Sequence, residues 1–349
     1  MVLLLLLAIQ LAPVAPESPN RQPQLASYGN TIGVTYGSGD TVYFAASTDA
    51  GRTFSPPVIV SSTGKLSLGR HRGPRLAFTS AGIVISAIVG SQGGGRDGDL
   101  VAWRSADGGK TWSEAVRVND VPGSAREGLH AMAFGGADTL FAAWLDLRTE
   151  GTRVYGAVST DGGASWSSNR LVYESPSGTV CQCCHPSAAI DSSGVIHVMF
   201  RNAMEGSRDL HLTRSSDGGR TFEVAAKLGI GTWKLEGCPM DGGAVAVDQK
   251  GRVATIWRRD QTIFTTVAAD PETAIATGRD ATLAATTKGL FSAWTEGRSV
   301  MLKTPGAERP VVIDEDGASP SMTGLSSGSL VLAWESEGSI AIRVVPPFQ

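Results

Sequence analysis

One octapeptide occurs four times in this chain of 349 residues. Its pattern is Ser-x-Asp-x-Gly-x-Thr/Ser-aromatic, and the four copies contain Asp49, Asp107, Asp161 and Asp217. Successive aspartates lie 58, 54 and 56 residues apart. A nearly constant period of this length indicates that one supersecondary unit is repeated in a radial or stacked array. This repeat restricts the architecture more than any other feature of the sequence.

Each octapeptide has the composition of a tight hairpin connection. An Asp just ahead of Gly can accept backbone N–H bonds, while Gly takes the positive-φ position. We therefore interpret the four aspartates as parts of structural clips. The octapeptide resembles the Asp box, or BNR repeat, of the sialidase superfamily. This resemblance implies that each box joins the two outer strands of a propeller blade, on the face opposite the active site.

Strand-like runs fill the intervals between the boxes. Those at 74–78, 83–89 and 100–103 precede the second box, and the same scheme of three runs continues without boxes to the end of the chain. The sequence predicts an all-β fold, a single β-propeller of four-stranded antiparallel blades. We count seven blades, whereas the sialidase resemblance implies six. The last blade lacks a fourth strand after Val345, and we expect the N-terminal segment to supply it.

The composition suits one large domain with many turns: 42% of residues are hydrophobic, 18% are charged and 43 are glycine. A net charge of -3 gives no reason to expect a nucleic-acid partner. The apolar run at 1–12, followed by three prolines, predicts a leader at 1–18, a domain at 19–349 and a secreted or periplasmic location. The alternatives for that run are a misplaced start codon and an apolar strand. No later run is long enough to span a membrane, and we expect a monomer.

All four cysteines lie in two segments that enter inner strands of consecutive blades. One segment, 181–186, reads Cys-Gln-Cys-Cys-His-Pro, and the other, 236–241, reads Glu-Gly-Cys-Pro-Met-Asp. Three interpretations stay open. The cysteines could form disulfides, for example Cys181 or Cys184 with Cys238, or a redox-active thiol pair. They could instead hold copper or zinc, with soft ligands drawn from Cys181, Cys183, Cys184, His185, Cys238, Met240 and His130.

The sialidase resemblance also implies a catalytic set, which the sequence meets only in part. It implies three arginines that bind the substrate carboxylate, a Tyr nucleophile activated by a Glu, and an Asp as acid/base. The candidates are Arg72, Arg75, Asp146, Arg201, Arg258, Glu236 and Asp241. None of the five tyrosines lies in the C-terminal half, where that family has its nucleophile. Whether the protein is an enzyme therefore stays open.

The sequence favours an exported propeller with a binding or accessory role. Its ligand would be a small molecule, a glycan or a protein, held on the upper face near the channel mouth, beside a copper or zinc site. The alternatives are a sialidase-type glycoside hydrolase with displaced catalytic residues and an interaction scaffold braced by disulfides.

Overall fold

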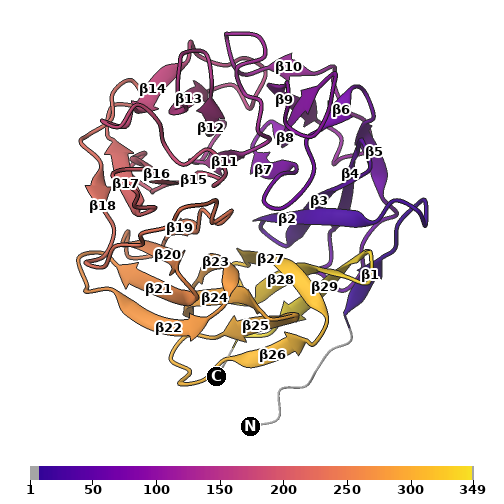
Figure 1. The fold of residues 1–349 in the computed structure, drawn as a ribbon. Helices are drawn as coiled ribbons and strands as arrows, with labels where there is room; N and C mark the ends of the chain where they lie inside the picture. The colour runs from indigo at the N-terminus through magenta and orange to yellow at the C-terminus, as the bar shows by residue number, and fades with distance from the viewer. Residues whose placement is uncertain (1–7, 348–349) are drawn as a thin grey trace.

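A computed structural model describes residues 8–347 of the chain. Seven antiparallel sheets surround a central channel, so the predicted all-β propeller with seven blades is confirmed (Figure 1). The first four blades contain β2 (Asn20–Tyr28), β3 (Thr31–Ser38), β4 (Thr41–Ser47) and β5 (Val58–Ser61); β7 (Arg75–Thr79), β8 (Gly82–Gly90), β9 (Asp99–Ser105) and β10 (Val116–Arg117), with β6 (Lys65–Leu66) as an extra strand; β11 (His130–Phe134), β12 (Leu140–Asp146), β13 (Arg153–Ser159) and β14 (Arg170–Tyr173); and β15 (Ser187–Ile190), β16 (Ile196–Arg201), β17 (Leu210–Ser215) and β18 (Ala226–Lys227).

The last three blades complete the ring. They contain β19 (Ala244–Val247), β20 (Val253–Arg259), β21 (Thr262–Val267) and β22 (Thr273–Thr277); β23 (Arg279–Thr286), β24 (Gly289–Glu296), β25 (Ser299–Lys303) and β26 (Val311–Asp314); and β27 (Gly317–Gly324), β28 (Leu330–Ser336), β29 (Ser339–Val345) and β1 (Ile9–Leu11). Within residues 8–347 there is no helix with the length and apolarity needed to cross a bilayer.

The N-terminal strand closes the ring, as predicted. Strand β1 pairs antiparallel with β29, from Ile9 opposite Ile342 to Leu11 opposite Ile340. The side chain of Asn20 donates a hydrogen bond of 3.0 Å to the Leu11 carbonyl, which fixes β1 to the start of the first blade. This strand lies inside the predicted leader, whose residues 1–7 fall outside the described part of the chain.

The hydrophobic core is divided among the contacts between neighbouring blades. One cluster joins Val84 and Ile88 of the second blade to Leu140 and Trp144 of the third. Small inner-strand residues such as Ala131 face the crowded centre, where larger side chains would separate the seven strands. The blades therefore hold one another in place, and the inner strands converge on one channel.

Each octapeptide connects the third strand of a blade to the fourth. In the second copy, Asp107 accepts hydrogen bonds from the backbone N–H groups of Lys110 and Thr111 and from the Thr111 hydroxyl. Gly109 has φ +89°, and a Cβ atom there would lie 2.2 Å from the Phe44 ring of the preceding blade. The box therefore closes its own hairpin and also seats it against the neighbouring blade.

Candidate ligand-binding site

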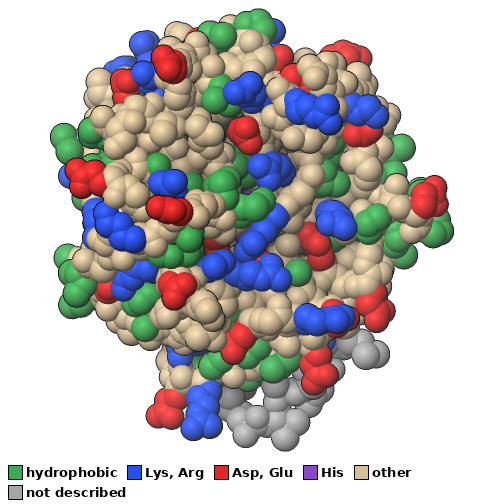
Figure 2. All heavy atoms as spheres, in the orientation of Figure 1, with side chains coloured by type: hydrophobic (Ala, Val, Ile, Leu, Met, Phe, Trp, Pro, Cys, Tyr) green, Lys and Arg blue, Asp and Glu red, His purple; other side chains and the backbone are tan. Residues whose placement is uncertain are grey.

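The seven inner strands line a cavity of about 220 Å³ at the channel mouth. Every blade contributes side chains, and the ionisable ones among them are His71, Arg75, His185 and Asp280. We call this cavity the cup. It is smaller than the usual ligand pocket of roughly 300–1,000 Å³, so it suits one sugar ring or one small organic ion. Figure 2 shows a band of Lys and Arg side chains across the centre of the visible face.

Arg75 is the cation of the cup that has no acidic partner. Its Nη1 donates to the carbonyls of Gly73 and Pro74, and its Nη2 donates to the carbonyl of His71. Two N–H groups, on Nε and Nη2, have no acceptor among the described residues, nor does a carboxylate approach within 4.0 Å. Enclosure in the channel wall lowers the pKa of Arg75 to about 10, so it still carries its charge at neutral pH. An Nε/Nη2 edge is the part of an arginine that binds a carboxylate with two parallel hydrogen bonds.

Asp280 is the one carboxylate of the cup, and three cationic or polar groups already hold it. His71 Nε2 and Arg70 Nε each lie 2.9 Å from its Oδ1, and Arg279 Nη1 lies 2.7 Å from its Oδ2. Burial opposes ionisation, but the His71 bond and the two arginine charges hold the pKa of Asp280 below its usual range. Arg75, Arg70 and Arg279 carry three positive charges against the one charge of an ionised Asp280, so the side chains in and directly beside the cup have a net positive charge.

His185 stacks on His71 with 4.2 Å between ring centroids. Its Nε2 lies 3.1 Å from the carbonyl of Gly243, which requires Nε2 to carry the proton, and its buried Nδ1 has no hydrogen-bond partner. Burial, followed by the nearby His71 and Arg75, lowers the pKa of His185 well below its usual range. The ring is thus neutral, and it fixes the His71 ring in place by stacking.

Unusual backbone conformations surround the cup. Six of the seven segments at the start of the inner strands contain a non-glycine residue with positive φ: Gln22, His71, Glu127, Met240, Asp280 and Ser319. Such conformations cost about 1–3 kcal/mol each and concentrate at functional sites. Four of these six residues, Gln22, His71, Asp280 and Ser319, line the cup.

The structure brings together three of the seven predicted metal ligands. The Sγ atom of Cys181 lies 3.5 Å from that of Cys184 and 3.7 Å from that of Cys183, and the three sulfur atoms all lie within 4.8 Å of one another. The fourth cysteine, Cys238, is exposed and outside this group, and all four are free thiols, so the pairing with Cys238 is not formed. His185 is also outside the group, and Met240 is a half-buried residue with positive φ on the segment before β19.

The remaining predicted ligand, His130, serves the packing between two blades. It is fully buried, and its Nε2 lies 3.0 Å from the hydroxyl of Ser86 on β8. Burial, with the charge of Arg75, lowers the pKa of His130 well below its usual range. The ring is therefore a neutral part of the wall behind Arg75.

Two of the predicted arginines connect blades. Arg201 is buried, and it donates to the backbone carbonyls of Asp241, Arg208 and Arg258. Arg258 donates to the carbonyl of Asp260, and both guanidinium groups lie over the Trp233 ring. Neither residue lines the cup, so they do not form a carboxylate clamp with Arg75.

The other catalytic candidates lie in different surroundings. Arg72 donates to the Glu127 carbonyl and lies 3.5 Å from its carboxylate. Glu236 is exposed, whereas Asp241 is fully buried and its Oδ2 accepts the N–H of Asp280. Since one carboxyl group faces solvent and the other supports the cup from behind, the two do not form an acid/base pair.

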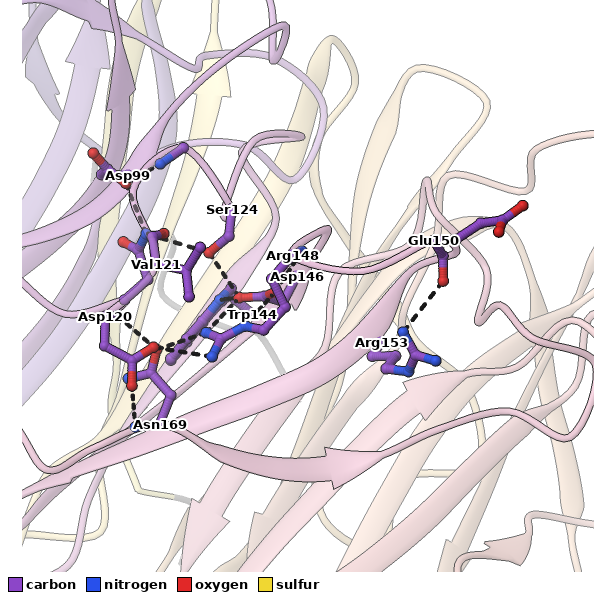
Figure 3. Close-up of polar contacts among 12 residues, drawn as sticks. Asp99, Asp120, Val121, Ser124, Trp144, Asp146, Arg148, Glu150, Arg153 and Asn169 are labelled. Carbon is purple, nitrogen blue, oxygen red and sulfur yellow. Dashed lines mark hydrogen bonds and ion pairs between the residues drawn. The ribbon is translucent and has the colours of Figure 1, made fainter.

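Asp146 is enclosed by donors at the end of β12, as Figure 3 shows. Its carboxylate accepts bonds from the Ser124 hydroxyl, from Trp144 Nε1 and from the backbone and side chain of Arg148. Arg148 also contacts Asp120 and stacks 4.0 Å from the centre of the Tyr155 ring. With every oxygen bonded and no exposure, Asp146 has the environment of a structural residue.

The fold and its boxes define an Asp-box β-propeller. The chain belongs to the BNR repeat-like domain family, which residues 33–256 match. No curated protein matches it in sequence. Three solved structures show the same fold: a protein of unknown function from Dyadobacter fermentans DSM 18053 (14% identity, 98% of both chains, TM-score 0.60), the Hadza microbial sialidase Hz136 (14%, 90% of this chain and 76% of that one, 0.53), and an ulvan lyase bound to -[GlcA(1-4)Rha3S]- (10%, 97% and 96%, 0.58).

Proposed function

We propose that the protein binds a small anion, or the acidic end of a glycan, in the cup. The observation that carries this proposal is that Nε and one N–H of Nη2 of Arg75 have no acceptor among the described residues, in a cavity whose single carboxylate is already bonded to His71, Arg70 and Arg279. A partly buried cation without a counter-ion loses hydration, and a bound carboxylate would supply both the charge and the two acceptors. The relatives in fold include a lyase solved with a GlcA-containing sugar, which agrees with an acidic ligand.

The test is calorimetric titration with galacturonate, N-acetylneuraminate and neutral galactose. We expect the two acids to bind and galactose not to bind. The Arg75→Gln variant should lose roughly 10- to 150-fold in affinity for the acids, since glutamine can supply one of the two donors and the charge-assisted bond that is lost is worth about 1.5–3 kcal/mol. The matched control is Arg214→Gln, because Arg214 is exposed, pairs with the exposed Glu223 and does not line the cup. Equal binding of galactose, or unchanged binding by Arg75→Gln, would contradict the proposal.

Acid–base chemistry on such a ligand is the second candidate function. His71 and Asp280 form a hydrogen-bonded pair beside Arg75 in the cup, so His71 could accept a proton from a carbon next to a carboxylate that Arg75 neutralises. The glycosidic C–O bond on the following carbon would then break, its oxygen would take a proton from water, and an unsaturated sugar would remain. The residues that line the cup include no tyrosine, which disfavours a sialidase nucleophile there. Ultraviolet absorbance of unsaturated products, after incubation with polyuronates, tests this candidate. This candidate function requires that the wild type forms unsaturated product and that the His71→Ala variant forms none.

We further propose that the protein is exported and acts as a monomeric accessory protein. The apolar run at 1–12 supports export, and since Ile9–Leu11 of this run form β1 of the seventh blade, export would have to leave β1 in the folded chain. Fractionation of the source cells would locate the protein, and recovery in the cytoplasmic fraction alone would reject this part of the proposal.

A further inference from the structure

The three cysteines at the start of the fourth blade have the spacing of a metal-ligand set. For a sulfur–metal distance of about 2.3 Å, two thiolates of a tetrahedral site lie about 3.8 Å apart. The Sγ distances of 3.5 Å and 3.7 Å from Cys181 approach this value. A disulfide would need about 2.05 Å between sulfur atoms, so the three thiols already match a shared cation more closely.

The protein backbone holds these thiols in position. The N–H of Cys181 donates to the carbonyl of Arg201 at 3.0 Å, which anchors the segment to the end of β16. Cys184 Sγ accepts the N–H of Asp241, from the next blade, at 3.4 Å. Cys181 and Cys184 are buried, whereas Cys183 is half-buried. One side of the thiol group is therefore open to an entering ion and to a fourth ligand from solvent.

The surroundings compensate negative charge at this point. Arg201 is buried, donates only to backbone carbonyls, and forms no salt bridge with any described carboxylate. Three thiolates around a divalent cation have a net charge of −1, which the Arg201 charge would neutralise. A monovalent cation would leave more negative charge unless one thiol kept its proton.

We propose that Cys181, Cys183 and Cys184 form a binding site for one thiophilic d10 cation, Zn²⁺ or Cu⁺. Soft thiolate ligands select these ions over Mg²⁺ or Ca²⁺. Its protein thiolates are these three, and the histidines His130 and His185 and the thiol of Cys238, from the set that the sequence suggested, lie outside the group.

The proposed site is connected to the cup through Asp241. The Asp241 N–H contacts Cys184, its Oδ2 accepts the N–H of Asp280, and Asp280 holds His71. A bound cation would therefore rigidify the residue that positions the Asp280 backbone. Such supporting bonds around metal ligands commonly change affinity 10- to 100-fold when they are removed.

The test uses the full chain, reduced without oxygen and titrated separately with Zn²⁺ and Cu⁺ against chromophoric chelators. We expect one equivalent of at least one ion to bind, and the number of thiols that react with a thiol reagent to fall from four to one, leaving Cys238. Cys184→Ser and Cys183→Ser each remove one of the three ligands, so each should weaken binding by more than the roughly 100-fold that a lost supporting bond costs at most. Cys183→Ser is the variant less prone to misfold, because Cys183 is only half-buried whereas Cys184 is buried.

Cys238→Ser is the matched control, because Cys238 is exposed and outside the group. It should bind the ion as the wild type does and leave no reactive thiol. The proposal fails if neither ion protects the thiols, if Cys238→Ser weakens binding as much as Cys184→Ser, or if a disulfide between Cys181 and Cys184 persists in the reduced protein. These results do not depend on ligand binding in the cup, so they test the thiol site separately.

Discussion

Replacing Asp146 with alanine should destabilise the propeller without affecting the cup. Asp146 lies at the end of β12 and its side chain is fully enclosed. Its carboxylate accepts bonds from Trp144 Nε1 at 2.7 Å, from the Ser124 hydroxyl at 2.9 Å and from Arg148 Nε at 2.8 Å. Alanine would leave these buried donors without an acceptor.

The expected loss in the free energy of unfolding depends on how far each hydrogen-bond partner of Asp146 is buried. Breaking a buried ion pair from one side costs about 3–5 kcal/mol. Arg148 keeps its contacts with Asp120 and Asn169, which reduces the loss, while Trp144 Nε1 is left unpaired, which increases it. We expect about 4 kcal/mol, or roughly 8 °C in Tm at about 2 °C per kcal/mol. Asp146→Asn retains the shape and one acceptor, so its loss should be smaller, about 1–2 kcal/mol.

Thermal unfolding and ligand titration of the same samples provide the assay. Asp120→Ala is the control, since the partly exposed Asp120 carboxylate contacts the same guanidinium and should cost no more than about 1 kcal/mol. The expected order of Tm is wild type, Asp120→Ala, Asp146→Asn and Asp146→Ala, with unchanged affinity for acids. If Asp146→Ala keeps the wild-type Tm and loses ligand binding, then Asp146 is a functional residue and our reasoning is refuted.

Two further predictions concern the closure of the ring and the boxes. A chain that starts at residue 19 lacks β1, which exposes the edge of β29 and removes the burial of Leu11. Its Tm should therefore fall by roughly 4–6 °C, and it should show more aggregate in size-exclusion chromatography. An unchanged Tm would mean that β1 does not close the blade. Burial opposes ionisation of Asp161, but hydrogen bonds from Ser165 and Ser159 lower its pKa to about 2. The stability that this carboxylate contributes is therefore present at neutral pH and is lost as the pH falls from about 4 toward 2. Asp161→Asn should therefore unfold more easily than wild type at pH 7, and the difference in Tm should shrink below pH 4; a difference that grows in acid would reverse the sign and reject the account.

The fold was predictable because its information is local and repeated. The boxes, the three runs between them and the missing last strand are all readable along the chain, and together they predicted seven blades and closure by the N-terminal segment. The thiol group was predictable for the same reason, because Cys181, Cys183 and Cys184 lie within four consecutive positions.

The cup was predicted only in part, since its contacts join distant residues. His71 and Asp280 are 209 residues apart, and the strand bulge that aims Asp280 at the channel leaves no pattern in the sequence. The sequence also did not predict in which direction each side chain points. Cys238 and His130 occupy the expected segments, yet one faces solvent and the other fills the wall between two blades. Position along a repeat indicates which face a segment occupies, but packing decides which side chains meet.

A crystal structure of the protein soaked with galacturonate would test the central claim most directly. The account predicts density for the carboxylate in the cup, with its two oxygens about 3 Å from Nε and Nη2 of Arg75. Density for the acid on the face of the boxes, or an empty cup at saturating ligand, would contradict it.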